Sequence, residues 1–464
     1  MNEKKYLKWY NKVGYGTGDI AGNVVYAFLS FFVMIYLTDA QGMNAGVVGT
    51  LMMLSKLFDG VSDFIFGVLM DKTRSRMGKA RPWMFWAFFG CAAMIIAIFA
   101  IPTSLGDTAK YAWFFIAYTL LNAVFYTANN IAYGALTALI TKNPNERVQM
   151  GSIRFVFAFG TSLAIQAATV GAVEAMGGGA DAWRNIAIIY SVVGLLSNTL
   201  AVFSVRELTP AELADEGAGE ADSAVPLKEA LGLLIHNKYY VLLVVMFIMM
   251  QLFGALNGMG IYFMTYVLHD PKLLGAFAWA SNIPQMVALL SLPFIVAKVG
   301  NMQKVSLWGY GIAIVARIGI VIGGYLTNVP MMLVFTAISM LGTSALQGTL
   351  TALIAEASEH TYLTSGKRLD GLMFSCTSLG TKLGGGLGTA LTGWLLSAAG
   401  YVSTTAGKAV DQPDSVITML QFAYLWLPTI IVIVIAGIVT LVDVEAVNQR
   451  LRDAAAERVE AIKV

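Results

Sequence analysis

Apolar runs of roughly twenty residues recur along this chain of 464 residues, with short polar segments between them. A helix needs about twenty apolar residues to cross the roughly 30 Å of hydrocarbon in a bilayer. Twelve runs have this length, so the pattern predicts twelve membrane-spanning helices. We expect them at residues 19–38, 45–70, 82–102, 111–140, 151–175, 183–205, 239–268, 273–298, 303–326, 329–355, 369–398 and 415–442.

Composition agrees with this pattern. The chain is 57% hydrophobic and 12% charged, with a mean hydropathy of +0.68, which excludes a water-soluble protein. One long connection is rich in Ala, Gly and Glu and divides the spans six and six. We therefore predict an all-α membrane protein with four parts: an amino-terminal six-helix bundle at 1–205, a cytoplasmic linker at 206–238, a carboxy-terminal six-helix bundle at 239–442 and a cytoplasmic tail at 443–464.

Basic residues fall on one side of the predicted membrane. Four lysines precede the first span, five basic residues fill the second connection, and the first connection has none. By the positive-inside rule, both termini are cytoplasmic in a multi-pass protein of the cell membrane. The first span carries Asp19 and Asn23 without a small-residue cleavage site, so we interpret it as a retained helix. Cys91 and Cys376 lie within spans, so no disulfide framework is expected.

Two carboxylates interrupt the second span. Asp59 and Asp63 are four residues apart and share one helix face, with Lys56 one turn earlier. An ionised Asp at the bilayer centre costs at least about 2.5 to 3.5 kcal/mol, so both must face a cavity and find a cation, a proton or Lys56. Lys56 can pair with only one of them, which leaves a coupling-cation site as the alternative to a structural ion pair. Thr127 in the fourth span and Ser62 offer neutral oxygens to the same ion.

Several segments resemble one known family. They are YGTGDIAGN at 15–23, FDGVSD at 58–63, DKTRSRMGKARPW at 71–83, YTANNIAYGAL at 126–136, the region of Arg154, and Lys382. Their order and spread over nearly the whole chain resemble the glycoside-pentoside-hexuronide:cation symporters, the melibiose carrier-like family of the major facilitator superfamily. The resemblance implies the major facilitator superfamily fold, cation-coupled sugar symport by alternating access, and cation ligands at Asp59 and Asp63.

The identity of the ion stays open between Na⁺ and H⁺. Ser62 stands where the sodium-using melibiose branch is expected to carry an amide side chain, and this departure puts Na⁺ in doubt. We expect no cofactor, and no metal beyond a possible Na⁺.

A sugar site needs hydrogen-bonding groups and aromatic faces in the cavity between the two halves. The candidates at membrane depth are Asp19, Asn23, Tyr126, Asn130, Tyr133, Arg154 and Lys382, with Asn129 as a further amide on the same helix. For a single Asn or Tyr, hydrogen bonding between helices is the default interpretation. At the positions of Asn23 and Asn130, the pattern of the melibiose-type carriers has carboxylates, whereas this chain has amides. The loss of two negative charges makes the pocket less repulsive to an anionic sugar. A hexuronide, a pentoside and a neutral glycoside all stay open.

The second connection resembles the cytoplasmic gating motif of the superfamily. The residues concerned are Gly67, Asp71, Arg74, Arg76, Gly78, Lys79 and Arg81. The positive-inside rule alone would account for the basic run, as a signal that sets the orientation of the spans. The gating role is therefore additional and is implied by the resemblance. Asn143, in a cytoplasmic connection, is expected to be inert. The role of Arg317, a lone cation in the ninth span, stays open.

Other function classes fit the sequence less well. A membrane enzyme is disfavoured because His236, His269 and His360 lie at span ends without a metal or nucleophile cluster. A channel or a uniporter is harder to exclude. A uniporter would not need Asp59 and Asp63, so this pair is the discriminating feature; a transporter of a non-sugar solute is a weaker alternative. We expect a sugar, a monovalent cation and membrane lipid as partners, no nucleic acid, and function as a monomer.

Overall fold

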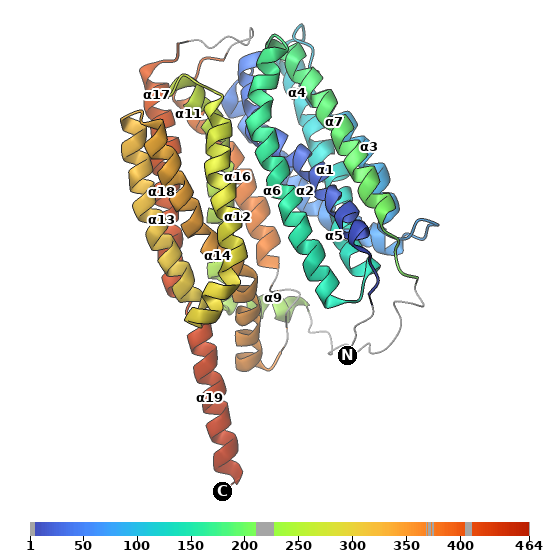
Figure 1. The fold of residues 1–464 in the computed structure, drawn as a ribbon, viewed down its shortest axis with the longest axis vertical. Helices are drawn as coiled ribbons and strands as arrows, with labels where there is room; N and C mark the ends of the chain where they lie inside the picture. Colours follow the sequence, from blue (N-terminus) through green and yellow to red (C-terminus); the bar gives the residue numbers. More distant parts are fainter. Residues whose placement is uncertain are drawn as a thin grey trace. The chain divides into compact units, whose positions relative to one another are not determined.

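The computed structural model describes residues 5–209, 227–367, 369, 373, 375–403 and 411–463. Its described residues form helices and connections, with no strand among them (Figure 1). The first six predicted spans correspond to α1 Trp9–Phe28 with its π-helical continuations η1 Leu29–Val33 and η2 Tyr36–Ala40, α2 Ala45–Lys72, α3 Arg81–Phe99, α4 Asp107–Thr119 with η3 Leu120–Tyr126 and α5 Thr127–Ile140, α6 Pro144–Ala175, and α7 Gly179–Ser204.

The remaining helices follow the same plan. They are α9 Leu227–His236, α10 Lys238–Leu256 with η4 Asn257–Met259 and α11 Gly260–Tyr266, α12 Leu273–Val299, α13 Met302–Tyr325, α14 Val329–Ser365, α16 Ser375–Ala398, α17 Asp414–Gln421 with η5 Phe422–Trp426 and α18 Leu427–Leu441, and α19 Val444–Lys463. Helix α9 lies within the predicted linker and was not expected; residues 210–226 of that linker lie outside the described residues.

Ten helical segments in the described part of the chain are long and apolar enough to cross a membrane. Helices α2 and α16 occupy the other two predicted spans and are also of spanning length. Helix α2 contains Lys56, Asp59 and Asp63, and α16 is rich in glycine and threonine, which lowers their hydropathy. The all-helical membrane fold is therefore confirmed, and the helix with the predicted ion site is one of the two that fall outside the set of ten.

Two helix ends differ clearly from the prediction. Helix α1 begins at Trp9 instead of residue 19, because a polar first turn with exposed Trp9 extends it beyond the apolar run. The backbone N–H groups of Tyr6 and Leu7, just before this helix, donate to the Glu146 carboxylate. Helix α14 continues to Ser365 instead of ending at 355, and its added turns contact α19.

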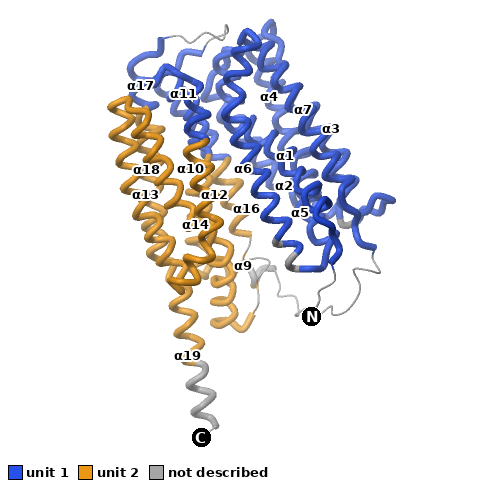
Figure 2. The backbone as a smooth tube through the Cα atoms, viewed as in Figure 1, with its two compact units in different colours: residues 1–217, 255–278, 386–420 blue, residues 218–254, 279–385, 421–464 orange. Residues whose placement is uncertain are grey.

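The described chain forms two compact units (Figure 2). Unit 1 contains residues 1–217, 255–278 and 386–420, and unit 2 contains residues 218–254, 279–385 and 421–464. In unit 1, α1 packs against α6 and α7, while α3 packs against α5 and α7. In unit 2, α13 crosses α14 so closely that a Cβ on Gly309 would collide with the carbonyl of Gly342, as in other membrane helix pairs with small residues at their contact.

Candidate functional site

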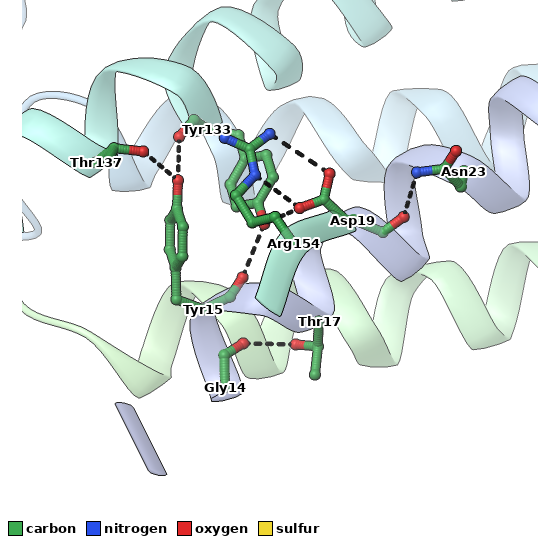
Figure 3. Close-up of polar contacts among 8 residues, drawn as sticks. All are labelled: Gly14, Tyr15, Thr17, Asp19, Asn23, Tyr133, Thr137 and Arg154. Carbon is green, nitrogen blue, oxygen red and sulfur yellow. Dashed lines mark hydrogen bonds and ion pairs between the residues drawn. The ribbon is translucent and has the colours of Figure 1, made fainter. Parts of the chain in front are cut away.

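An ion pair joins α1 to α6 in unit 1. The Nε of Arg154 lies 2.7 Å from Oδ2 of Asp19, and a second guanidinium nitrogen, Nη2, lies 3.4 Å from Oδ1 (Figure 3). Both side chains are partly exposed, at 30% for Arg154 and 14% for Asp19. A single unpaired charge within a membrane span is energetically costly, and here each of the two opposite charges compensates the other. They also leave guanidinium and carboxylate edges accessible to a polar solute.

Two tyrosines hold this pair in place. The Tyr133 hydroxyl donates to Asp19 Oδ2 at 2.7 Å, and the Arg154 guanidinium lies 4.2 Å from the centre of the Tyr133 ring. Tyr15 packs on Tyr133 with ring centres 4.7 Å apart and donates its hydroxyl to the Tyr133 carbonyl at 2.8 Å. Gly18 allows this approach, since a Cβ there would lie 2.6 Å from the Tyr133 ring. The result is a charged pair on an aromatic support, a combination suited to a polyhydroxylated ligand.

The other sugar-site candidates have separate positions. Asn23 donates from Nδ2 to the Asp19 carbonyl at 2.9 Å, one turn along α1. Tyr126 is half-buried, and its hydroxyl would lie 3.9 Å from a Cβ on Gly22 of α1. Asn130 is exposed on α5. Lys382 is half-buried on α16, in unit 2.

Asn129 has a structural position. Its Nδ2 donates to the Met84 carbonyl at 2.7 Å and to Asn198 Oδ1 at 3.0 Å, and Asn198 donates to the same carbonyl. Both amides are buried. Asn129 therefore ties α5 to α3 and α7, and the default interpretation of helix-to-helix hydrogen bonding is correct for this residue. Asn198 was not identified from the sequence, because a lone Asn in an apolar run carries no signal of its partner.

Asp59 and Thr127, two of the predicted ion-site residues, meet where α2 packs on α5. The Thr127 hydroxyl donates to Asp59 Oδ1 at 2.5 Å and is also 2.9 Å from the Asn122 carbonyl. Ser62 donates to the Asp59 carbonyl at 2.9 Å, so its oxygen retains lone pairs. Asp63 is half-buried one turn further along α2. A carboxylate and hydroxyl oxygens thus lie together near the start of α5, and they are the hard donors that Na⁺ accepts.

The sequence did not identify Asn122 as part of this cluster. The Nζ of Lys56 lies 3.3 Å from Asn122 Oδ1, and Asn122 belongs to the π-helical turn η3 that precedes α5. A π-helical turn displaces backbone carbonyls from the regular ladder, and such turns occur frequently at functional sites. Here the displaced geometry lets Thr127 reach the Asn122 carbonyl and Asp59 at once. Hydrophobic periodicity does not reveal an inserted residue of this kind.

The predicted gating connection is anchored by a residue that sequence reasoning assigned to the linker. The Glu207 carboxylate accepts hydrogen bonds from the backbone N–H groups of Lys79, Ala80 and Arg81, at 2.7, 2.9 and 2.9 Å, and so caps α3. Gly78 has a φ of +111°, and a Cβ there would collide with Glu207. Glu445 caps α13 of unit 2 similarly, accepting from Met302 and Gln303.

The other members of the motif have separate positions. Arg74 and Arg76 are exposed, Gly67 has no atom close to its Cβ position, and Arg81 donates from Nε to the Val202 carbonyl at 2.8 Å. The side chain of Asp71 lies outside the described residues.

Two further residues differ from, or add to, the sequence interpretation. Asn143, which is expected to have no part in sugar binding, has a structural position. It is buried, and its Oδ1 accepts from the backbone N–H of Glu146 at 3.3 Å in the first turn of α6. Asn143 therefore caps the start of α6. A polar residue of this kind, just outside an apolar run, cannot be told from a loop residue by sequence alone. Arg317 is 7% exposed, with its guanidinium 5.5 Å from the centre of the Phe253 ring in unit 2.

Comparison with known proteins decides the family. The family described as MFS/sugar transport protein matches residues 14–446, which is nearly the whole chain. The chain belongs to this family of the major facilitator superfamily. The predicted family and fold are therefore confirmed, and the chain is a membrane transporter and not an enzyme.

Named relatives and solved structures agree with this assignment. The chain is 27% identical to an isoprimeverose transporter of Lactiplantibacillus pentosus, over 92% of this chain and 87% of that protein. It is 27% identical to a putative glycoside/cation symporter of Escherichia coli, YagG, over 98% and 97%. It is 26% identical to the glucuronide carrier protein homolog of Escherichia coli, over 87% and 86%. The crystal structure of the nucleoside transporter NupG matches with a TM-score of 0.60 at 13% identity, covering 93% of this chain and 98% of that chain.

Proposed function

We propose that this protein is a cation-coupled sugar symporter that works by alternating access, with both termini in the cytoplasm. The observation that carries the proposal is the Asp59–Thr127 contact of 2.5 Å, in which a carboxylate at membrane depth meets a hydroxyl from another helix. A uniporter has no need for such a cluster. Asp59, Asp63, Ser62 and Thr127 hold Na⁺, or one of the two carboxylates carries H⁺.

The sugar occupies the partly exposed surface of the Asp19–Arg154 pair. Asp19 accepts hydrogen bonds from sugar hydroxyls, Arg154 donates to them, and Tyr133 supports both. Asn23, Tyr126 and Asn130 are the further candidates for this site in unit 1, and Lys382 of unit 2 stays a predicted sugar-binding residue. Because Asp19, Arg154 and Tyr133 already bond to one another, a ligand that displaces a contact without replacing its hydrogen bond binds weakly. The site therefore selects solutes with several hydroxyls in a fixed arrangement.

Helix α5 provides the physical basis for coupling. Its amino-terminal residue Thr127 contacts Asp59, while Tyr133, less than two turns further on, contacts Asp19. Occupation of the ion site fixes the start of α5 and the preceding turn η3. The sugar-facing residues of the same helix are then held in their binding arrangement, so each ligand lowers the ordering cost of the other.

The substrate class is a glycoside, a pentoside or a hexuronide. The named relatives support sugars of these kinds, and one relative is named a glycoside/cation symporter. Asn23 and Asn130 carry no charge, and Arg154 and Lys382 are cations, so this set of candidate residues is compatible with an anionic sugar as well as with neutral ones. We therefore extend the test to both kinds.

The decisive experiment is uptake of a sugar panel into proteoliposomes with imposed gradients of Na⁺ or H⁺. We expect at least one neutral glycoside, pentoside or hexuronide to accumulate above its outside concentration with one of the two gradients. Asp181→Asn changes an exposed carboxylate on α7 and is the matched control for the ion-site variants Asp59→Asn and Asp63→Asn. It should accumulate sugar normally. If the uptake of every sugar is the same with a Na⁺ gradient, with an H⁺ gradient and with neither, the protein is a uniporter instead.

A further inference from the structure

Unit 1 contains a cavity that is separate from the clusters described above and whose mainly apolar lining carries a few polar groups. It has a volume of about 410 Å³ and lies between the carboxy-terminal end of η2, the ends of α6 and α7 that face each other across their connection, and α11. Its polar and aromatic lining is formed by Asp39, Glu174, Trp183, Thr265, Tyr266 and His269. Along α1 and its continuations, Asp39 is twenty residues beyond Asp19, or about 30 Å at 1.5 Å per residue.

The Asp39 carboxylate is the centre of this cavity's polar wall. Its Oδ1 accepts from the Tyr401 hydroxyl at 2.5 Å and from the Thr38 hydroxyl at 2.8 Å, and its Oδ2 accepts from the Tyr266 hydroxyl at 2.7 Å. Tyr262 lies 2.9 Å from the Thr38 hydroxyl. Three hydroxyl donors therefore converge on one carboxylate beside an open cavity.

The remaining lining supplies the other elements of a polyol site. Trp183 is half-buried and is held by ring contacts with Tyr36 and Phe99, so its position is fixed before any ligand arrives. Glu174 forms an ion pair with Lys272, in which Oε2 of Glu174 lies 2.8 Å from Nζ of Lys272. A preformed cavity with a few convergent polar groups and an aromatic wall is the usual form of a small-molecule site.

We propose that this cavity is an outer binding site for a polyhydroxylated solute, in which sugar hydroxyls take the place of the tyrosine hydroxyls on Asp39. The inference rests on the proposed function, because under the proposed topology this end of α1 faces the outside. Sugar hydroxyls, like the hydroxyls of Tyr266 and Tyr401, can each donate one O–H to the carboxylate. Their exchange at Asp39 therefore keeps its hydrogen bonds, whereas an apolar solute would leave the carboxylate without these partners. Release of Tyr266 and Tyr401 removes two of the hydrogen bonds that tie α11 and the segment after α16 to η2, which links solute arrival to loosening of these contacts.

The test uses a reporter cysteine in the cavity wall. Thr265 lines the cavity and bonds only its own helix, through the Ile261 carbonyl, so Thr265→Cys is a mild change. The two native cysteines are buried and are replaced by Ala. The rate of labelling by a membrane-impermeant maleimide is then measured with D-xylose, D-glucose or D-glucuronate present, each compared with cyclohexanol. We expect at least one sugar to slow labelling several-fold, with cyclohexanol inactive.

Variants separate this site from the candidate central site. Asp39→Asn should raise the protecting concentration about tenfold or more, whereas Asp19→Asn should leave it unchanged. Protection that is lost in Asp19→Asn but kept in Asp39→Asn would show that labelling reports the central site, and this would overturn the proposal. Absence of protection by any sugar that the wild type transports would also overturn it, while leaving the symport function intact. If the wild type transports none of the three, the labelling is repeated with the sugar that it accumulates in the uptake panel, and absence of protection by that sugar overturns the proposal.

Discussion

Asp19 and Asp59 are both carboxylates at membrane depth in unit 1, yet their partners differ. Asp19 bonds a guanidinium at 2.7 Å and a phenol at 2.7 Å, whereas Asp59 bonds the hydroxyl of Thr127 at 2.5 Å and has a second carboxylate one turn away. A guanidinium is a permanent counter-charge, because it stays protonated. A threonine hydroxyl is a neutral oxygen that can turn toward an arriving cation. The first arrangement suits a neutral or anionic solute, and the second suits a transient ion.

The largest effect should come from neutralising the ion cluster. Asp59→Asn or Asp63→Asn removes one negative charge and one hard oxygen ligand, so gradient-driven accumulation of sugar should be abolished, while exchange or downhill flux survives in part. Both fluxes are measured in proteoliposomes with the same variant. Normal concentration of sugar by both variants would remove the coupling role from this pair.

The Asp19–Arg154 pair should show the next largest effect. Asp19→Ala or Arg154→Ala should weaken sugar binding roughly tenfold or more, because each leaves a polar partner unsatisfied at a cost of about 1 to 3 kcal/mol. The double variant should be less impaired in stability than the sum of the two single variants, since it leaves no uncompensated charge. Binding and thermal unfolding are measured on detergent-purified protein. Unchanged binding in both single variants, in folded protein, would remove these residues from the site.

Thr127 provides a finer comparison of the two clusters. Thr127→Val keeps the shape of the side chain and removes its hydroxyl, so the concentration of ion needed for half-maximal uptake should rise several-fold. Thr127→Ser should restore most of the loss because it restores the oxygen. Sugar affinity at saturating ion should change little in either variant. An equal loss in the Val and Ser variants would indicate a packing role instead.

Asn129 should affect stability without affecting either ligand. Its two hydrogen bonds join α5 to α3 and α7. Each such bond between membrane helices contributes about 0.6 kcal/mol on average, so Asn129→Ala should lower the free energy of unfolding by about 1 kcal/mol. Sugar binding at saturating ion should be unchanged. A tenfold loss of binding would place Asn129 in the sugar site after all.

The smallest effect concerns the cap between α6 and the start of the chain. Burial opposes ionisation of Glu146, but hydrogen bonds from Thr141 and from the backbone of Leu7 and Tyr6 outweigh it and lower its pKa. Its contribution to stability should therefore be full above its ordinary pKa of 4.5 and be lost as the pH falls through the lower, folded value. Thermal unfolding of Glu146→Gln should show a smaller loss between pH 7 and pH 4 than the wild type does.

Much of this fold follows from hydropathy, because bilayer thickness sets the length of each apolar run. The spans at 45–70 and 273–298 match α2 and α12 to within two residues at each end. The ends of α1 and α14 do not, since their extra turns lie outside the apolar runs and are set by contacts with distant segments. Bonds such as those of Glu207 to Lys79 join residues far apart in sequence, and no local pattern encodes them.

The candidate site shows the same division. The charges of Asp19, Arg154, Asp59 and Asp63 were evident in sequence because ionisable residues in apolar runs are expensive. The roles of Asn122 and of the π-helical turn η3 were not, because an amide in a span has many possible partners and a one-residue insertion leaves hydropathy unchanged. The functional roles of all these residues remain predictions.

The central claim is that the ion cluster and the sugar cluster are coupled through α5. Isothermal titration of sugar into purified protein, with and without Na⁺ at several pH values, tests it most directly. The account predicts that one ion, Na⁺ or H⁺, tightens sugar binding, that sugar tightens binding of that ion by the same factor, and that Asp59→Asn removes the effect. Sugar affinity that is the same with and without Na⁺ and across pH, in protein that binds sugar, would contradict the claim.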